Sequence, residues 1–493
     1  MGSGSLRASR PRTLTLLAAA LVTSGCTPSG GADGGPSAST SLGATSTTSL
    51  AVSTATAPDQ PTWIEVTTLS PGGGFTIPDY AANPSECFNP SRPSQVEGID
   101  ADTGLVLWST PVPHPGNGQL LIADSLLVMP VPEGWGRSQG MVALDATGRP
   151  LWEAATEWRL RGMPIAAGHS LITVLTSEVG SAVAALDGRT GEPQWFTPVD
   201  DALIWNPLPS VSATLGLVFV ADSDSTVSAL EIESGEIAWS HRVGQMSDGP
   251  VLAENGLYVV AGGSLVALDP LSGVTLWAAG DHDDSTMLHD VLSAGDRTVL
   301  VVGEDERTTS DQEVAWFTIS AFDTRDGLKL WEVEAFEWPV SGESTLLIHP
   351  TTPSLTGWTV DGIDPATGLR LWRLDNAGYA SLRTASLESD TALLSTLSPQ
   401  SVAVIDWPTG QVRLRVQIEG EPTAPPLIRP DRILIGTRVT TEAGAPTGSI
   451  VSVDPADGSI AWSEDRPSPI RGTPMQLGDT IVALVAEEYH FCF

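Results

Sequence analysis

A short pattern recurs nine times along this chain, and it constrains the fold more than any other feature of the sequence. Its clearest copy is Leu265–Trp277, LVALDPLSGVTLW. An apolar stretch, Leu265–Leu268, precedes a turn in which Asp269, Pro270 and Gly273 each favour a tight reversal of the chain. The residues that follow the turn are β-branched, aliphatic or aromatic, which is typical of strands. Each copy therefore predicts two antiparallel strands joined by a tight turn.

The nine copies share an acidic residue in the turn and, with one exception, a Trp at the end. The acidic positions are Asp100, Asp145, Asp187, Glu231, Asp269, Asp323, Asp364, Asp406 and Asp454. The closing residues are Trp108, Trp152, Trp195, Trp239, Trp277, Trp331, Trp372, Leu414 and Trp462. Successive acidic positions are 38 to 54 residues apart. Such a period, with strand content, is typical of a β-propeller of four-stranded blades.

The pattern A-x-D-x-x-T-G-x-x-x-W resembles the tryptophan-docking motif of the PQQ-like (pyrroloquinoline-quinone-type) β-propeller repeat, over roughly residues 96–493. The resemblance implies an all-β propeller of eight or nine four-stranded antiparallel blades. It also implies that the motif spans the last two strands of a blade, and that the eight motif Trp residues pack against the neighbouring blade. Glu231 and Leu414 depart from the pattern, so we expect weaker docking around Leu414.

The two ends of the repeat region are expected to meet in one blade. No two convincing strands precede the first copy, Val96–Trp108, whereas Thr473–Val485 after the last copy predicts two strands without partners. A blade of C-terminal inner strands and N-terminal outer strands would close the ring and remove its open edges. Two cysteines, Cys87 and Cys492, flank the same region. In an oxidising compartment they predict a disulfide across the closure, the alternative being two buried thiols.

The first 25 residues predict an export signal. Arg7, Arg10 and Arg12 precede Leu14–Val22, an apolar run of nine residues that is too short to span a bilayer. The small residues before Cys26 resemble a bacterial lipobox, which implies cleavage before Cys26 and lipidation of its thiol. The alternative is an ordinary secretory signal with an incidental Cys. We therefore predict an extracytoplasmic protein held at the cell membrane by a lipid anchor only.

Composition separates the rest of the chain into two parts. Residues 26–60 are rich in Ser, Thr, Gly, Ala and Pro and almost without charge, which predicts a disordered tether. Residues 61–493 are predicted to be the propeller. The formal net charge is −35, so the chain lacks the basic surface that nucleic acids or anionic lipids require. These classes of partner are excluded on charge.

Motifs for catalysis are missing from the sequence. Quinoprotein dehydrogenases resemble one another in a calcium site of Glu, Asn and Asp beside the quinone, and methanol-type members add two adjacent Cys, but no two Cys are adjacent here. No G-x-S-x-G, H-E-x-x-H or P-loop occurs. The acidic stretch Asp281–Asp290 contains side chains able to bind a divalent cation, but its spacing fits a solvated loop better. We predict no enzymatic activity, no cofactor and no metal.

Tryptophans outside the motifs indicate where a partner would bind. Five of them, with two arginines, are expected on or near one face of the ring, where the blades connect to one another. These candidate binding residues are Trp135, Trp158, Arg159, Arg161, Trp205, Trp338 and Trp358. Trp and Arg are common anchors of interfaces, and Trp also stacks on sugar rings. The alternative is that these Trp residues fill gaps between blades.

The sequence thus favours a non-enzymatic propeller that binds another envelope protein as a scaffold. A lipobox followed by these repeats is similar in layout to the propeller lipoprotein of outer-membrane protein assembly, although the identity of the partner stays open. Two other functions remain: binding of a carbohydrate or small solute at the Trp-rich face, and a quinoprotein-like oxidoreductase.

Overall fold

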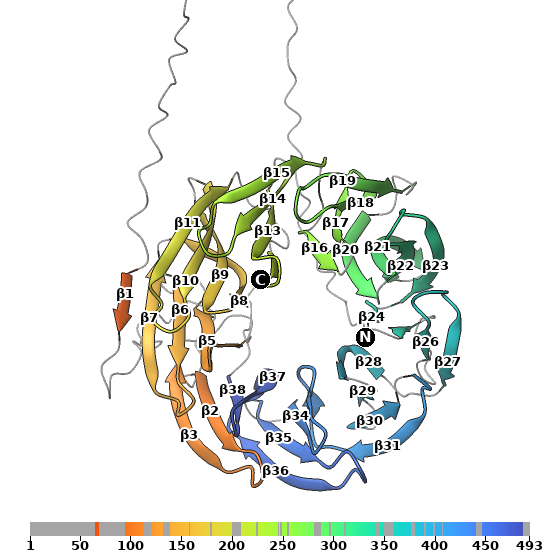
Figure 1. Cartoon of the computed structure of the whole chain (residues 1–493). Helices are drawn as coiled ribbons and strands as arrows, with labels where there is room; N and C mark the ends of the chain where they lie inside the picture. The colour runs from red at the N-terminus through yellow and green to blue at the C-terminus, as the bar shows by residue number, and fades with distance from the viewer. Residues whose placement is uncertain are drawn as a thin grey trace, which may run out of the picture. The chain divides into compact units, whose positions relative to one another are not determined.

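The computed structural model describes residues 65–68 and 94–486, the second range with gaps at 113–119, 132–138, 157, 178–179, 200–208, 223–224, 245, 247–248, 254–255, 281–286, 295–296, 310–311, 337, 342–344, 350–358, 376–379, 389–390, 398–399, 407 and 440–445. Pro61–Phe493 is one compact unit. Its described residues form strands and turns without a helix, in nine antiparallel sheets. Each sheet is a blade, and the blades follow one another around a ring (Figure 1).

The blades are numbered around the ring and their strands are given from the innermost outward. Blade 1 contains β37 (Ile470–Leu477), β38 (Thr480–Val485), β2 (Ser94–Asp100) and β3 (Val106–Val112). Blade 2 contains β4 (Leu121–Ala123), β5 (Leu126–Val131), β6 (Gln139–Leu144) and β7 (Pro150–Thr156). Blade 3 contains β8 (Arg159–Ala167), β9 (Ser170–Ser177), β10 (Gly180–Asp187) and β11 (Pro193–Val199).

Blades 4 to 6 repeat the same order. Blade 4 contains β12 (Ser210–Ser212), β13 (Leu217–Ala221), β14 (Thr226–Glu231) and β15 (Ile237–Arg242). Blade 5 contains β16 (Val251–Ala253), β17 (Gly256–Ala261), β18 (Ser264–Leu268) and β19 (Thr275–Ala279). Blade 6 contains β20 (Met287–Ala294), β21 (Thr298–Thr309), β22 (Gln312–Asp323) and β23 (Lys329–Ala335).

Blades 7 to 9 complete the ring. Blade 7 contains β24 (Val340–Ser341), β25 (Leu346–Ile348), β26 (Val360–Ile363) and β27 (Arg370–Leu374). Blade 8 contains β28 (Ala380–Glu388), β29 (Thr391–Leu397), β30 (Gln400–Asp406) and β31 (Val412–Gln417). Blade 9 contains β32 (Glu421–Pro422) and β33 (Leu427–Ile428), which both pair with β34 (Ile433–Arg438), then β35 (Gly448–Val453) and β36 (Ile460–Arg466).

Hydrophobic packing lies between the blades. Nine clusters of buried side chains each join the middle strands of two successive blades, including one that joins blade 9 to blade 1. The middle strands β13 and β17 are buried along their whole length. Strands covered on both faces suit continuous apolar runs such as Leu217–Ala221. The same type of hydrophobic contact therefore joins each blade to the next around the whole ring.

Ring closure and blade number follow from the sheet order. In blade 1 the C-terminal strands β37 and β38 are inner and the N-terminal strands β2 and β3 are outer, with Val96 opposite Leu484. The predicted closing blade is confirmed. The blade number, left between eight and nine by the sequence, is nine in this structure because every motif copy, including that ending at Leu414, belongs to its own sheet.

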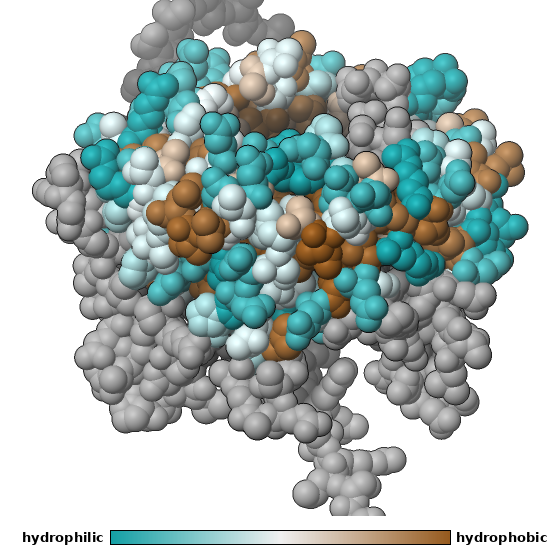
Figure 2. Space-filling model, turned by 90° about the horizontal axis from the view of Figure 1, so that it is seen from below, coloured by the Kyte–Doolittle hydropathy of each residue, from teal (hydrophilic) through white to brown (hydrophobic). Residues whose placement is uncertain are grey.

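One strand lies outside this repeating order. β1 (Glu65–Thr68) pairs antiparallel with β7 and adds a fifth, outermost strand to blade 2. Outer strands elsewhere carry exposed aliphatic side chains, for example Leu107 in β3 and Leu371 in β27. Seen from the side on which β36 and β3 lie, hydrophobic groups reach the surface in several separate places among hydrophilic ones (Figure 2).

Candidate functional site

The motif carboxylates organise turns. In blade 1, Asp100 Oδ1 accepts hydrogen bonds from the backbone N–H of Asp102 (3.1 Å) and Thr103 (2.8 Å) and from the Thr103 hydroxyl (2.7 Å). The Thr103 hydroxyl and N–H hold the pKa of Asp100 below its usual range. Asp269 accepts an equivalent set from Leu271 and Ser272. These carboxylates therefore stabilise the motif turns.

Each motif Trp docks on the turn of the next blade. The indole Nε1 donates to a backbone carbonyl in these pairs: Trp108 to Ala146 (3.1 Å), Trp152 to Gly188 (3.3 Å), Trp195 to Ile232 (2.7 Å), Trp239 to Pro270 (3.0 Å), Trp277 to Thr324 (2.9 Å), Trp331 to Pro365 (2.9 Å) and Trp462 to Ala101 (3.1 Å). The turn Gly supplies positive φ and close approach. A Cβ on Gly148 (φ 77°) would lie 2.2 Å from the Trp108 ring.

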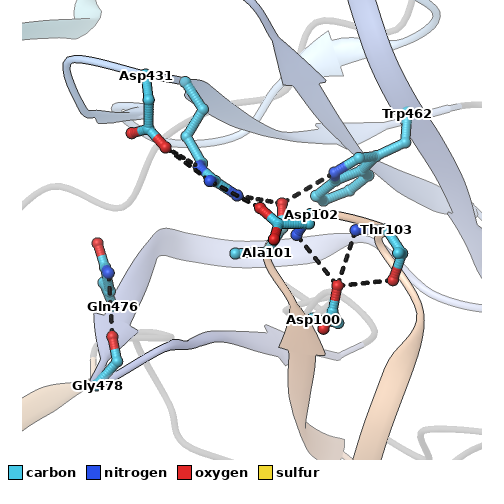
Figure 3. A network of polar contacts seen from close by, with 9 residues as sticks. Asp100, Ala101, Asp102, Thr103, Asp431, Trp462, Gln476 and Gly478 are labelled. Atoms are coloured by element: carbon cyan, nitrogen blue, oxygen red, sulfur yellow. Dashed lines mark hydrogen bonds and ion pairs between the residues drawn. The ribbon is translucent and has the colours of Figure 1, made fainter.

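The seam between blades 9 and 1 carries a polar network (Figure 3). Trp462 Nε1 and the Arg432 guanidinium both donate to the carbonyl of Ala101. Arg432 also pairs with Asp102 at 3.0 Å and with Asp431 at 2.6 Å. One arginine in the turn of blade 9 thus holds the motif turn of blade 1.

A buried ion pair strengthens the same seam. Arg466 Nε lies 2.6 Å from Glu97 Oε2, and the two side chains are only 5% and 8% exposed. Glu97 belongs to β2 and Arg466 ends β36, so the pair joins positions 369 residues apart. The predicted disulfide at this closure, Cys87–Cys492, lies outside the described residues and remains a prediction.

The two ends of the ring differ in what they present. One end, the motif-turn face, carries the motif turns and the turns between first and second strands. The opposite end, the loop face, carries the connections between blades and those between second and third strands. Within the described part of the chain, no group of three or more His, Cys, Asp or Glu residues is arranged to hold a metal ion. Residues 281–286 of the acidic stretch Asp281–Asp290 are outside that part.

Two of the predicted binding residues are placed on the loop face. Trp158 precedes β8 and meets Phe196 edge to face, with ring centroids 5.5 Å apart and planes at 88°. Trp338 precedes β24 and meets Phe317 in the same way at 5.3 Å and 78°. Both indoles are half-buried. An edge-to-face contact fixes the ring while leaving part of it open to solvent.

The other candidates are described only in part. The backbones of Arg159 and Arg161 pair with Thr176 and Val174 of β9, which places both arginines on the inner strand of blade 3. Trp135, Trp205 and Trp358 lie outside the described residues, as does Cys26. The structure therefore brings two of the five candidate Trp residues to one face, and the role of the whole set stays a proposal.

Several polar clusters were not anticipated from the sequence. Asp124, between β4 and β5, contacts His169 Nδ1 (2.6 Å) and Arg189 Nε (3.2 Å) of blade 3. Asp361, only 5% exposed, pairs with Arg373 at 2.6 Å. Asp323 is bound by Arg325 and Arg297, and the hydrogen bonds from Arg325 hold its pKa far below the usual range. The Asp124 contacts link two blades, and the pairs Asp361–Arg373 and Asp323–Arg297 join residues 12 and 26 positions apart, so no local sequence signal marks them.

Nine sheets joined by tryptophan docking define a β-propeller of PQQ-like repeats. A family model described as outer membrane protein assembly factor BamB matches residues 63–203, 180–334 and 356–488. These matches cover most of the propeller region, and the chain belongs to this family.

Two curated relatives carry the same description. BamB of Burkholderia pseudomallei (strain K96243) is 25% identical over 256 residues, which are 48% of this chain and 60% of that protein. BamB of Yersinia pestis is 24% identical over 211 residues, 38% of this chain and 53% of that protein. The chain thus spans between about half and three fifths of the length of these relatives.

Solved structures show more distant similarity. BamB from Moraxella catarrhalis aligns with 66% of this chain and 95% of its own, at a TM-score of 0.44 and 16% identity. The dihydro-heme d1 dehydrogenase NirN aligns with 71% of this chain and 77% of its own, at 0.44 and 14%.

Among the residues described, no helix is long and apolar enough to cross a bilayer.

Proposed function

We propose that this chain is a lipid-anchored, extracytoplasmic propeller that binds another envelope protein at its loop face and catalyses no reaction. Membership of the BamB family is the observation that carries the proposal, because its curated relatives are named as outer membrane protein assembly factors. Because the chain spans only part of the length of those relatives, their role and partners are a hypothesis for this chain.

The geometry of the two faces supports binding at the loop face. Motif carboxylates such as Asp100 and Asp269 are engaged by their own turns, which favours a structural role for the motif-turn face. On the loop face, Trp158 and Trp338 each have a ring held edge to face by a Phe. Rigid, half-buried aromatic rings lose little conformational entropy on binding, as interface anchors require.

Affinity purification from the native host tests this proposal. The tagged full chain should co-purify one abundant envelope protein, and Trp158→Ala with Trp338→Ala should reduce its yield at least tenfold. A matched control is Leu369→Ala, since Leu369 is 68% exposed but closes the motif turn of blade 7, at the opposite end of the ring. Equal recovery with the double variant and the wild type would contradict the proposed face.

The lipid anchor at Cys26, the Cys87–Cys492 disulfide and the absence of enzymatic activity are each tested by a separate experiment. Mass spectrometry of the mature N-terminus should find a lipid on Cys26, and Cys26→Ser should release the protein from the membrane fraction. A thiol count of zero on the denatured, unreduced Cys26→Ser chain would support the Cys87–Cys492 bridge.

Reduction of a dye by the protein with added quinone, calcium and an alcohol or sugar would contradict the proposal that the protein is not an enzyme.

The half-buried indoles of Trp158 and Trp338 also suit a carbohydrate, because Trp faces stack on sugar rings. A glycan array separates this second candidate from the first. Specific glycan binding that is lost with Trp158→Ala, in the absence of a protein partner, would favour it.

A further inference from the structure

The hairpin between the second and third strands of blade 6 projects from the loop face. β21 and β22 are 12 residues long each and pair up to Thr309 opposite Gln312. β20 pairs with β21 only as far as Glu304, and β23 pairs with β22 only as far as Phe317. The last five residues of β21 and the first five of β22 therefore form a two-stranded ribbon beyond the four-stranded part of the blade. At the usual rise of a strand this ribbon is roughly 15 Å long.

Four aromatic rings gather at the base of the ribbon. Trp316 meets Phe336 at a centroid distance of 6.1 Å and an interplanar angle of 80°, next to the pair of Phe317 and Trp338. Trp316 and Phe317 are successive strand residues, so their rings lie on opposite faces of the hairpin. The N–H of Phe336 donates to the carbonyl of His349 in blade 7 (2.7 Å), which fixes this residue at the seam between the two blades.

These four residues, the aromatic base, are all half-buried. Trp316 was not among the binding residues predicted from the sequence, because it lies inside a long strand and its place at the end of the sheet depends on where β23 stops. Rings that are held by neighbouring rings and remain partly open to solvent are typical of interface anchors. The aromatic base therefore extends the surface around Trp338.

The charge around the aromatic base selects the kind of partner that fits it. Residues 304–313, at the outer end of the hairpin, contain five acidic residues and one arginine. Residues 280–286, which connect β19 to β20, contain three aspartates and no lysine or arginine. Glu334 near the end of β23 is exposed as well. In blade 3, by contrast, the inner strand carries Arg159 and Arg161. Negative charge beside aromatic rings is thus a property of blade 6 and not of the Trp158 region.

We propose that the aromatic base and the acidic hairpin of blade 6 bind a basic segment of the envelope partner. The inference rests on the proposed function and names the chemistry of the partner at that face. Arginine or lysine side chains of such a segment lie against the indole rings, where a cation is attracted by the face of the ring. Their charges are at the same time complementary to the carboxylates of the hairpin. An acidic segment is repelled here, and an apolar one leaves the carboxylates unpaired.

Fluorescence anisotropy of the purified full chain in detergent tests the inference with two labelled decapeptides, one of alternating arginine and serine and one of alternating glutamate and serine. The wild type should bind the basic peptide and not the acidic one. Neutralising the hairpin with Glu304→Gln, Asp305→Asn and Glu306→Gln should raise the dissociation constant at least about tenfold, because three attractive charges are lost. Trp316→Ala should raise it about threefold through the lost ring.

A matched control removes the same number of charges from the motif-turn face, because any cationic peptide is attracted to so acidic a chain. Its substitutions are Glu192→Gln, Glu233→Gln and Glu236→Gln, at exposed positions in the motif turns of blades 3 and 4. This triple variant should change the dissociation constant less than about twofold, and circular dichroism should show every variant folded. Equal weakening by the two triple variants would overturn the inference, since bulk charge alone would then explain binding.

The inference and the proposed function fail in different experiments. Absence of any protein that crosslinks or co-purifies through the loop face overturns the proposed function. A basic peptide whose affinity is unchanged by the hairpin variant overturns the assignment of a basic segment to blade 6, even where a partner at the loop face has been found.

Discussion

At the scale of single residues, the motif Trp is the contact that repeats most faithfully around the ring. Its indole N–H bonds a carbonyl of the next blade and its ring lies against that blade's turn Gly. Trp152 is the most buried of the set, at 1% exposure. Large buried side chains of this kind dominate the energetics of packed interfaces.

Loss of Trp152 should therefore destabilise the whole ring. We expect Trp152→Ala to lower the free energy of unfolding by about 3–5 kcal/mol, from lost apolar burial and the cavity left behind. Urea denaturation followed by circular dichroism measures it. Trp158→Ala is the control, because Trp158 is half-buried outside the motif and should cost much less. Equal costs for the two variants would contradict the docking role.

At Leu414, the one motif position without a Trp, the docking contact can be tested by introducing a Trp. A Cβ on Gly458 would lie 3.1 Å from Leu414, whereas the equivalent Cβ on Gly410 would lie 2.2 Å from Trp372. The smaller side chain leaves this turn less tightly covered. Leu414→Trp should raise the free energy of unfolding by roughly 0.5–2 kcal/mol, as filling a gap does. Destabilisation in thermal or urea unfolding would show that blades 8 and 9 have repacked around the leucine.

At the scale of elements, the motif turn could be predicted well from the sequence, because its residues interact within the turn. Asp100, Thr103 and Gly104 are neighbours along the chain, and their roles follow from turn chemistry. β1 was not predicted, because four residues carry too little pattern to be recognised alone. The proposed binding face was predicted only as a group of Trp and Arg residues, since loop positions carry no periodic signal.

The carboxylates of the motif turns should also determine how the stability of the protein changes at low pH. Asp100, Asp269 and Asp406 have a folded-state pKa held low, chiefly by the hydroxyls of Thr103, Ser272 and Thr409. A carboxyl with a lowered folded-state pKa stabilises the fold fully above its unfolded pKa, about 4, and this stabilisation disappears as the pH falls through the folded-state pKa.

The matched comparison is the triple variant Thr103→Val, Ser272→Ala and Thr409→Val, measured by urea unfolding between pH 6 and pH 3. The wild type should lose more stability than the variant across this range, because the variant's carboxyls titrate closer to their unfolded pKa. Identical pH profiles would mean that the hydroxyls do not set the acid response.

At the scale of the whole molecule, closure of the ring depends on contacts between the chain's two ends. The order of strands in the closing blade could be predicted because the repeats left two strands unpaired at one end and two missing at the other. The ion pair of Glu97 and Arg466 could not, because nothing in a sequence pairs charges 369 residues apart. Blade number required the structure, since a repeat ending in Leu414 does not reveal whether it forms its own sheet.

Breaking that ion pair should loosen the seam. Arg466→Met leaves Glu97 buried without its partner and should cost about 3–5 kcal/mol of unfolding free energy. The double variant Glu97→Gln with Arg466→Met should cost less than the sum of the two single changes, because they share one interaction. Lys329→Met is the control: its pair with Glu332 is exposed and contributes at most about 1 kcal/mol. Additive costs in urea unfolding would contradict the coupling.

Binding of an envelope protein at the loop face is the central claim, and site-resolved crosslinking in living cells tests it most directly. A photoreactive amino acid at Trp338 should crosslink to one envelope protein. The same group at Leu369, which closes the motif turn of blade 7 on the motif-turn face, should not. Crosslinks to that protein from Leu369 and none from Trp338 would contradict the account and move the binding surface to the motif-turn face.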